Sequence, residues 1–380
     1  MHICQLISLP FPPEEGIGNH VYNLSRNLIK LNHEVTVITR GPWNKIQRES
    51  IDNIDVIRVP FIPLYPFHIH LHGLSVNKIF KTLESEIDIV HTHSPLCPLI
   101  KTSLPLITTI HTPMLTDYRN VKLESMRIMS LKLTSRFVSY QVESKLLKAS
   151  DIVMTVSSSV AQELMEEYKL SPERIFIVGN GVDEKFFHPE KEKNEGNNRY
   201  ILFVGKIDRE KGVFDLLECG RHLCKEMSNI SFILAGQGKD FKTLKKEVIR
   251  VGLQEKFILL GQVDKKKLVK LYQNATLFVF PSYHEGLPTV ILEAMSCSLP
   301  IIATNVRGNR ELISHGKNGI LIPSRDTKKM TETILALLND DKMRQLLGKN
   351  ARKTIEDNYT WNIISNRIFK IYESTLEKRR

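Results

Sequence analysis

The sequence lacks the features that mark several classes of protein. Its five cysteines are scattered and form no Cys-x-x-Cys pair, which argues against a zinc or redox motif. No apolar run approaches the roughly 20 residues of a membrane span. The N-terminus has no basic segment followed by a small-residue cleavage site. These absences predict free buried thiols and a cytoplasmic chain.

The composition is otherwise that of an ordinary globular protein, with 42% hydrophobic and 25% charged residues. A length of 380 residues favours two domains, each with its own core. The formal net charge of +11 favours anionic partners, namely nucleic acid, an acidic membrane or a phosphorylated small molecule. Basic clusters such as Lys265 to Lys267 are interpreted as solvated helix faces, and no nucleic-acid-binding motif accompanies them. We therefore expect no nucleic-acid partner.

Short runs rich in Ile and Val alternate with longer helical patterns along the whole chain. This alternation is typical of βαβ units around a parallel sheet, and near-continuous hydrophobicity predicts strands buried on both faces. The runs in the first half are 2–8, 34–39, 54–59, 87–90, 106–110, 151–156 and 174–178, and those in the second half are 200–204, 230–235, 256–260, 276–280 and 300–303.

The rhythm is interrupted once, at 188–198 (HPEKEKNEGNN), as an exposed linker would interrupt it. We therefore predict an N-terminal domain at 1–187, a linker at 188–198 and a C-terminal domain at 199–358. The segment 359–380 is predicted to be a closing helix, and we hypothesise that it packs back toward the N-terminal domain. Open parallel sheets bind ligands beyond the carboxyl ends of their strands, so two facing domains would place a ligand between them.

Two glutamates follow the predicted strand 276–280, in the segment from Glu285 to Glu293 (EGLPTVILE). Pro288 suits the first turn of a helix, which puts Glu285 in the loop before it and Glu293 within it. Free backbone N–H groups and the positive end of the helix dipole form an anion site, while carboxylates accept hydrogen bonds from sugar hydroxyls. The pattern suits a nucleotide sugar, although an exposed glutamate pair on an ordinary loop remains the alternative.

Two lysines, Lys206 and Lys211, flank the loop that follows the strand 200–204. Each is a compact cation suited to a diphosphate, whose negative charge grows as a glycosidic bond breaks. Surface lysines are common, so only their position at a strand end favours this role. We also note Gly16 and Gly18, which follow the first strand; no third glycine completes a dinucleotide-binding fingerprint, and we reject that interpretation.

Together with further motifs, these segments resemble the family-4 glycosyltransferases of the "glycosyl transferases group 1" type. The further motifs are Asn180-Gly-Val-Asp183, Gly261-Gln-Val263, Pro281-Ser282 and Leu292-Glu-Ala-Met295. The resemblance implies the GT-B fold, an α/β architecture of two doubly wound, Rossmann-like parallel-sheet domains that face each other across a cleft. It also implies a retaining transferase that moves a sugar, most simply a hexose, from a nucleotide sugar.

The resemblance implies a role for each matching residue. Glu285 would contact the donor sugar and Glu293 the ribose, while Lys206, Lys211 and the amide of Gly16 would approach the diphosphate. The Val263 backbone would lie near the nucleobase. The catalytic set is then His111, Glu285, Lys206 and Lys211, and the remaining donor contacts are Leu287, Pro288, Thr289 and Val290. Four positions depart from residues common in the family, which puts loop geometry rather than the reaction in question. They are Lys206, Glu15, Gly179 and Ser298.

Several histidines follow predicted strands. His111 ends an apolar strand and, by resemblance, contacts the donor sugar. His91 and His93 share one face of their strand end and are predicted on the acceptor side of the cleft. The set His68, His70 and His72 is interpreted as part of a histidine-rich loop rather than as a metal site.

The sequence therefore predicts a glycosyltransferase that uses a UDP- or GDP-sugar as substrate and needs no cofactor. No Asp-x-Asp motif is present for a divalent ion, and we predict no metal site. Two alternatives stay open, a nucleotide-sugar epimerase of the same fold and a non-catalytic sugar-nucleotide-binding protein.

The acceptor is predicted to be a glycan, a lipid or a lipid-linked sugar. Residues 122–148 mix apolar side chains with Lys132, Arg136, Lys145 and Lys148, a basic amphipathic pattern compatible with an anionic membrane surface. A core helix with lysine edges would look the same. Peripheral contact with the inner face of a membrane is thus one of two interpretations.

Overall fold

The computed structural model describes residues 1–11, 16–64, 67–114, 126–190 and 199–379, and side chains are described outside 126–137. The chain divides into two units, unit 1 (Met1–Asn180 with Trp361–Arg380) and unit 2 (Gly181–Thr360). Among the described helices, none combines the length and apolar character that a membrane crossing requires.

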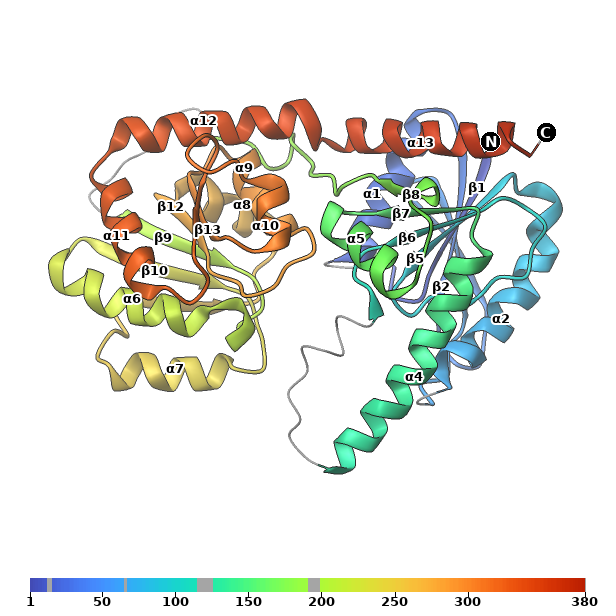
Figure 1. The fold of residues 1–380 in the computed structure, drawn as a ribbon, viewed down its shortest axis with the longest axis horizontal. Coiled ribbons are helices and arrows are strands. Elements are labelled where there is room, and N and C mark those ends of the chain that lie inside the picture. Colours follow the sequence, from blue (N-terminus) through green and yellow to red (C-terminus); the bar gives the residue numbers. More distant parts are fainter. Residues whose placement is uncertain (12–15, 65–66, 115–125, 191–198, 380) are drawn as a thin grey trace. The chain divides into compact units, whose positions relative to one another are not determined.

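Unit 1 is built on an eight-stranded sheet with the order β3-β4-β2-β1-β5-β6-β7-β8. The strands are β1 (His2–Ile7), β2 (Glu34–Gly41), β3 (Gln47–Ile51), β4 (Ile54–Pro60), β5 (Ile89–Ser94), β6 (Leu106–Ile110), β7 (Ile152–Thr155) and β8 (Ile175–Ile177). All neighbours pair in parallel except β3 and β4, which are antiparallel. β1, β5 and β6 are buried almost throughout, because helices cover both faces of the sheet (Figure 1).

The helices of unit 1 are α1 (Ile17–Lys30), α2 (His68–Leu83), α4 (Met126–Ala149), α5 (Ser158–Glu167) and α13 (Trp361–Glu377), with short 3-10 turns at Glu84–Glu86 and Pro172–Arg174. α13 packs on α1, and Ile364, Ile368 and Tyr372 are fully buried in the core cluster that contains Leu24 and Leu28 of α1. The C-terminal helix therefore completes the core of unit 1.

Unit 2 has a six-stranded, all-parallel sheet with the order β11-β10-β9-β12-β13-β14. Its strands are β9 (Arg199–Val204), β10 (Ile230–Ala235), β11 (Phe257–Gly261), β12 (Leu277–Phe280), β13 (Ile301–Thr304) and β14 (Ile320–Ile322). The helices are α6 (Val213–Glu226), α7 (Phe241–Arg250), α8 (Lys265–Asn274), α9 (Thr289–Ser296), α10 (Arg307–Leu312), α11 (Thr327–Leu338) and α12 (Asp341–Asn358), with a 3-10 turn at Arg209–Lys211 (Figure 1).

This strand order is that of a doubly wound sheet, in which the direction of winding reverses between β9 and β12. Such a sheet binds its ligands beyond the carboxyl ends of the strands at the reversal point. The loops that leave β9 and β12 are those that contain Lys206, Lys211 and Glu285. The topology thus brings the two predicted donor-binding motifs to one edge of the sheet, namely the edge formed by the carboxyl ends of its strands.

Two details differ from the sequence-based expectations. The units divide between Asn180 and Gly181 rather than at 188–198, since Phe187 is buried in unit 2 and its carbonyl accepts a hydrogen bond from Ser296. The predicted histidine-rich loop is wrong, because α2 begins at His68. His68 and His72 lie one helical turn apart and are buried, whereas His70 is exposed.

Candidate active site

The loop that follows β9 is held tightly against two neighbouring loops. Gly212 has φ 70°, and a Cβ atom there would lie 2.1 Å from the Pro281 carbonyl oxygen. Gly236, at the end of β10, has φ 142°, and its Cβ would lie 1.9 Å from the Gly205 carbonyl oxygen. Only glycine fits at such contacts. The backbone positions of Lys206 and Lys211 are therefore fixed by close packing of main chain on main chain.

The loop that follows β12 is fixed from three sides. The Tyr283 amide donates to the Glu210 carbonyl at 2.8 Å, and the Thr304 hydroxyl donates to the Ser282 carbonyl. The Gly308 amide donates to the Glu285 carbonyl at 3.2 Å, and a Cβ at Gly308 would lie 2.7 Å from that oxygen. Glu285 thus rests on the start of α10 in a defined position, as a ligand-binding carboxylate requires.

Lys211 and Glu285 meet at this edge of the sheet. Lys211 Nζ donates to Glu285 Oε1 at 2.6 Å, and the same ammonium lies 6.0 Å from the centre of the Phe280 ring. The side chains are 27% and 11% exposed. Because both charges are largely withdrawn from water, their interaction is stronger than that of an ordinary surface pair. The pair offers a cation and a carboxylate side by side to a ligand that carries both phosphate and hydroxyl groups.

The helix that follows Glu285 supplies further groups. α9 starts at Thr289, with Pro288 as its N-cap, and no side chain caps its first amides among the described residues. Glu293, farther along α9, accepts a hydrogen bond from the Tyr272 hydroxyl at 2.9 Å. Burial and the adjacent Glu293 carboxylate raise the pKa of Tyr272 well above its ordinary value, so the phenol remains a donor. Tyr272 therefore orients the Glu293 carboxylate.

The other predicted donor contacts lie as follows. Lys206 is exposed, whereas Leu287 and Pro288 are buried. Thr289, the first residue of α9, is exposed, and the next residue, Val290, is partly buried. Val263 is partly buried in the loop between β11 and α8. Gly16, in unit 1, is the N-cap of α1 with φ 70°. Glu15 lies outside the described residues.

Unit 1 gathers four histidines at the carboxyl ends of its central strands. His91 Nδ1 lies 2.6 Å from the Tyr372 hydroxyl and Nε2 lies 2.7 Å from Thr109 Oγ1, so both ring nitrogens are occupied within the unit. His93 Nδ1 lies 3.4 Å from His111 Nε2. His20, in the first turn of α1, packs its ring 4.7 Å from that of His111. Sequence analysis did not select His20, although it lies directly beyond the glycines that we noted.

Burial makes this histidine group sensitive to acid. It lowers the pKa of His20 to about 4 and that of His91 to about 3, and it places those of His93 and His111 well below the ordinary value. Each histidine is then neutral when folded and takes up a proton only on unfolding. Between pH 6.5 and about 4 the unfolded chain binds more protons, so the folded state loses stability as the pH falls.

We predict that the urea midpoint of the protein falls steeply as the pH is lowered from 7 to 5, with each buried histidine contributing about 1.4 kcal/mol per pH unit in its window. Chemical unfolding followed by circular dichroism at several pH values measures the slope of the free energy of unfolding against pH. A His20→Gln variant should show a shallower slope. A flat profile for the unmodified chain, or an unchanged slope in the variant, would contradict the assignment.

Besides His20, three features of the site were missed by sequence analysis. Tyr272 gave no signal because it lies on α8, far in sequence from Glu293. Tyr283 donates to Asp215 at 2.9 Å and carries the Arg325 guanidinium over its ring at 4.5 Å, which fixes the loop before Glu285 from α6. The Gly236-Gln237-Gly238 segment could have been recognised, since two glycines directly after a predicted strand indicate close main-chain packing.

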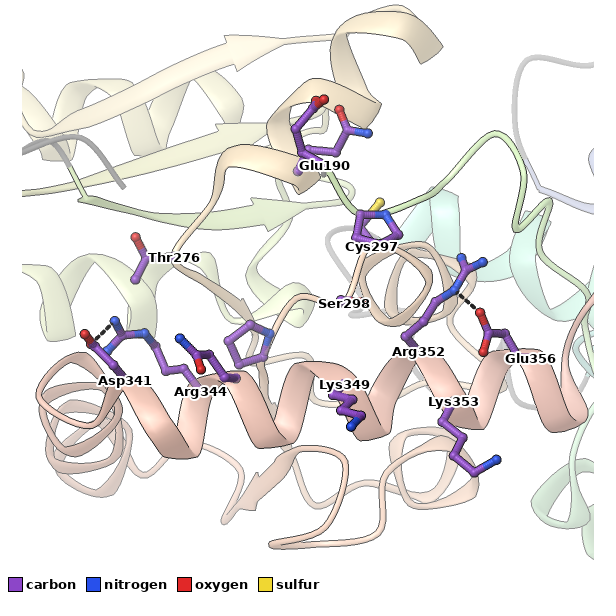
Figure 2. Close-up of a pocket in the computed structure, with 14 residues that line it drawn as sticks. Glu190, Thr276, Cys297, Ser298, Asp341, Arg344, Lys349, Arg352, Lys353 and Glu356 are labelled. Atoms are coloured by element: carbon purple, nitrogen blue, oxygen red, sulfur yellow. Dashed lines mark hydrogen bonds and ion pairs between the residues drawn. The ribbon is translucent and has the colours of Figure 1, made fainter. Parts of the chain in front are cut away.

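A pocket of about 460 Å³ lies elsewhere in unit 2 (Figure 2). Its basic side chains come from α12, and its two arginines are already used within the unit. Arg344 pairs with Asp341 and donates to the last carbonyls of α11, and Arg352 pairs with Glu356 and donates to the Ser296 carbonyl (Figure 2). None of the predicted site residues lines this pocket, which we interpret as structural.

Comparisons with known proteins agree with this architecture. The model of the family "Glycosyltransferase Family 4" matches residues 15–186, and that of "Glycosyl transferases group 1" matches residues 183–354. A glycosyltransferase of Methanocaldococcus jannaschii is 28% identical, with 96% of both chains covered.

Solved structures give the same result at the level of the fold. Sucrose-phosphate synthase from Thermosynechococcus elongatus superposes with a TM-score of 0.82 at 21% identity, over 99% of each chain. The Anabaena protein HepE, solved in complex with UDP-glucose, superposes with a TM-score of 0.73 at 17% identity, over 98% of this chain and all of HepE. These neighbours show the fold, and the two adjoining family models, which together span residues 15–354, lead to one conclusion: the chain belongs to the group 1, family 4 glycosyltransferases.

Proposed function

We propose that the protein is a retaining hexosyltransferase that moves a sugar from a UDP- or GDP-sugar to a glycan, lipid or lipid-linked acceptor. The observation that carries this proposal is the contact between Lys211 and Glu285 at the point where the sheet of unit 2 reverses its winding. A cation for the diphosphate and a carboxylate for the sugar hydroxyls stand side by side there. The sugar nucleotide is the substrate, and the transfer needs no cofactor.

The geometry supports one arrangement of the donor. The diphosphate lies against Lys211, Lys206 and the free amides at the start of α9, where the helix dipole also favours negative charge. Glu285 accepts hydrogen bonds from the sugar, and Glu293, oriented by Tyr272, accepts them from the ribose. The Val263 backbone faces the nucleobase. For two residues of unit 1 we propose the roles that the family resemblance implies: Gly16 approaches the diphosphate, and His111 contacts the sugar and positions its reacting carbon.

The proposed reaction is a front-face substitution. The acceptor oxygen bonds to the anomeric carbon as the bond to the diphosphate oxygen breaks on the same face, and the acceptor proton passes to the departing diphosphate. The lysines and the α9 amides stabilise the charge that develops on the leaving group. Retention follows because attack and departure share one face of the sugar.

An NMR assay tests this proposal. UDP-, GDP- and ADP-sugars are incubated with the protein alone, and the products are identified together with the anomeric configuration of the released sugar. We expect slow hydrolysis of one donor with retention. Epimerisation without release of the nucleotide would favour the epimerase alternative, and stabilisation without any turnover would favour a binding protein. No change in any donor with well-folded protein would refute the proposal.

We also propose that unit 1 contacts an anionic membrane surface, on the cytoplasmic side, through a groove between α2 and α4. This groove, of about 550 Å³, has an apolar floor that includes Ile69, Leu99 and Val142. Four exposed lysines line it, namely Lys78, Lys81, Lys101 and Lys145. Leu74 at its edge is 71% exposed. Apolar surface ringed by cations complements the headgroups and chains of acidic lipids. Most of the segment 122–148 lies outside the described side chains.

Reversal of two charges at this groove should weaken membrane binding. A Lys78→Glu/Lys81→Glu variant is expected to bind phosphatidylglycerol vesicles about 30-fold less tightly or worse, because each lysine near an acidic surface contributes about 1 kcal/mol. Vesicle sedimentation at low salt measures this. The matched control, Lys245→Glu/Lys246→Glu on α7, makes the same charge change in unit 2. Equal losses in both variants would show that net charge rather than the groove governs binding.

A further inference from the structure

Four side chains of unit 1 contact one another at the carboxyl ends of β1, β2 and β4, apart from the residues assigned to the donor. Ser8 directly follows β1, Arg40 lies near the end of β2, and Phe61 directly follows β4. His72 comes from the second turn of α2. The three strands are neighbours in the sheet, which brings their ends side by side. We call these four residues the Arg40 cluster.

The Phe61 ring joins the members of the cluster. The guanidinium carbon of Arg40 lies 5.3 Å from the centre of this ring, and His72 packs edge-on against it with ring centres 5.4 Å apart. Stacking on an aromatic face holds a guanidinium in place and leaves its N–H groups free to bind. Arg58 of β4 pairs with Glu49, whereas Arg40 has no carboxylate partner in the part of the chain that the structure describes. Arg40 therefore keeps its donors for a ligand.

His72 brings a second unused donor to the cluster. The residue is fully buried, and its Nδ1 lies 3.0 Å from Ser8 Oγ. Its Nε2 is buried and has no hydrogen-bond partner among the described residues. Burial and the Arg40 charge lower the pKa of His72 to about 4, so the ring is neutral at pH 7. The Ser8 hydroxyl uses its own proton when it donates to Nδ1, which places the single ring proton on Nε2.

The unused groups of the cluster fit an anion. Arg40 and His72 Nε2 both donate, so a ligand that supplies only acceptor atoms satisfies them together. A guanidinium binds phosphate or carboxylate through two parallel hydrogen bonds. One guanidinium already engages both oxygens of a carboxylate, whereas a phosphate ester has a further oxygen for the imidazole N–H. The chemistry of the cluster therefore favours a phosphate ester.

We propose that the Arg40 cluster binds a phosphate ester and that this ester belongs to the sugar acceptor. The second half of the proposal rests on the proposed transfer function, and the first half does not. The strands β2, β1, β5 and β6 are successive neighbours about 4.8 Å apart, so Arg40 lies roughly 14 Å from His111, which follows β6. The phosphate thus lies on a part of the acceptor that is remote from the reacting hydroxyl.

Exposed apolar side chains flank the cluster. Trp43 lies in the loop that follows Arg40, and Ile62 and Leu64 lie in the loop that follows Phe61. All three are exposed. Exposed apolar groups beside a binding site are typical of contact with an apolar ligand. We therefore expect a phosphate ester that carries acyl chains to bind more tightly than the same ester without them.

Binding of small anions tests the first half of the proposal. Glycerophosphate, dihexanoyl phosphatidic acid below its micelle concentration, and glycerate are each titrated into the unmodified protein in a calorimeter. We expect both phosphate esters to bind and glycerate to bind weakly. Tighter binding of the lipid identifies a lipid headgroup as the source of the ester, and equal binding identifies a soluble ester; either result supports the site. Absence of binding by both esters, or equal binding of glycerate and glycerophosphate, would overturn the proposal.

Four variants locate the site. Arg40→Met should weaken glycerophosphate binding about 10-fold or more, because hydrogen bonds to charged groups are strong. His72→Leu removes the other donor and should also weaken binding, so it serves if Arg40→Met misfolds. The matched control Arg48→Met changes the same charge on exposed β3 and should bind normally, as should Lys211→Met at the donor edge of unit 2. Normal binding by the folded cluster variants, or a loss confined to Lys211→Met, would contradict the assignment.

The second half is tested with a donor that the protein turns over. The donor is incubated with an extract of lipids and soluble metabolites from the source cells, and glycosylated products are identified by mass spectrometry. We expect the product to carry phosphate on the acceptor part. An acceptor without phosphate would overturn this half. Since the titrations measure binding alone, failure of the transfer function and failure of the Arg40 cluster can be told apart.

Discussion

Replacement of Glu285 by Gln is expected to lower donor turnover about 100-fold while leaving nucleoside diphosphate binding unchanged. In the structure Lys211 holds the carboxylate, and the Gly308 amide of α10 holds the main-chain carbonyl of Glu285, so the amide variant keeps its size and place. It loses a charged acceptor for sugar hydroxyls, and hydrogen bonds to charged groups contribute about 1.5–3 kcal/mol each. Steady-state hydrolysis of the active donor measures the effect.

The matched control is Glu255→Gln, which makes the same change on an exposed residue before β11. It should leave turnover unaltered. Equal turnover in Glu285→Gln and the control would show that this carboxylate does not touch the sugar. A joint loss of turnover and nucleotide binding would instead point to a role at the diphosphate.

Gly212→Ala is expected to destabilise the protein by about 2–5 kcal/mol and to abolish donor binding. The substitution puts an alanine at φ 70° and places its Cβ 2.1 Å from the Pro281 carbonyl oxygen. Left-handed backbone costs a non-glycine residue about 1–2 kcal/mol, and a forced main-chain shift adds about 1–3 kcal/mol. The shift separates the loop of Lys211 from that of Glu285. Thermal unfolding and isothermal titration with donor measure both effects.

Gly252 provides the control because it has φ 72° but no atom within 4 Å of its would-be Cβ. Gly252→Ala should therefore lower the free energy of unfolding only by the cost of left-handed backbone, about 1–2 kcal/mol. The variant should bind donor normally. If the two variants were equally stable, close packing of Gly212 on Pro281 would not be what holds the two loops together.

Much of the fold was predictable because the buried parallel strands are continuous apolar runs. β6 and β10 match the predicted ranges 106–110 and 230–235. β3 was missed, since Gln47–Ile51 is an exposed antiparallel edge strand with polar residues and no apolar run. β14 was missed because its apolar run ends at Ile322, directly before Pro323, whereas the run of β8, an equally short strand, continues through Val178. In α2 the buried positions Val76 and Phe80 continue the spacing of His68 and His72, a helical signal that the alternating histidines obscured.

The candidate site was likewise predictable only in part from the sequence. Lys211 and Glu285 are 74 residues apart, yet both follow strand ends, so a parallel sheet brings them to one edge. The bond from Tyr272 to Glu293 and the histidine cluster around His20 depend on how helices pack against those strands. No local pattern encodes such contacts, and they required the structure.

Thermal stabilisation by UDP and GDP, without any sugar, tests the central claim most directly, namely that the loops after β9 and β12 hold the donor diphosphate. We predict that one of the two nucleotides raises the melting temperature of the unmodified chain and of the exposed-lysine control Lys246→Met on α7. Lys211→Met should lose this stabilisation. Stabilisation that persists in folded Lys211→Met, or that fails equally in Lys246→Met, would contradict the placement of the donor at this edge of unit 2.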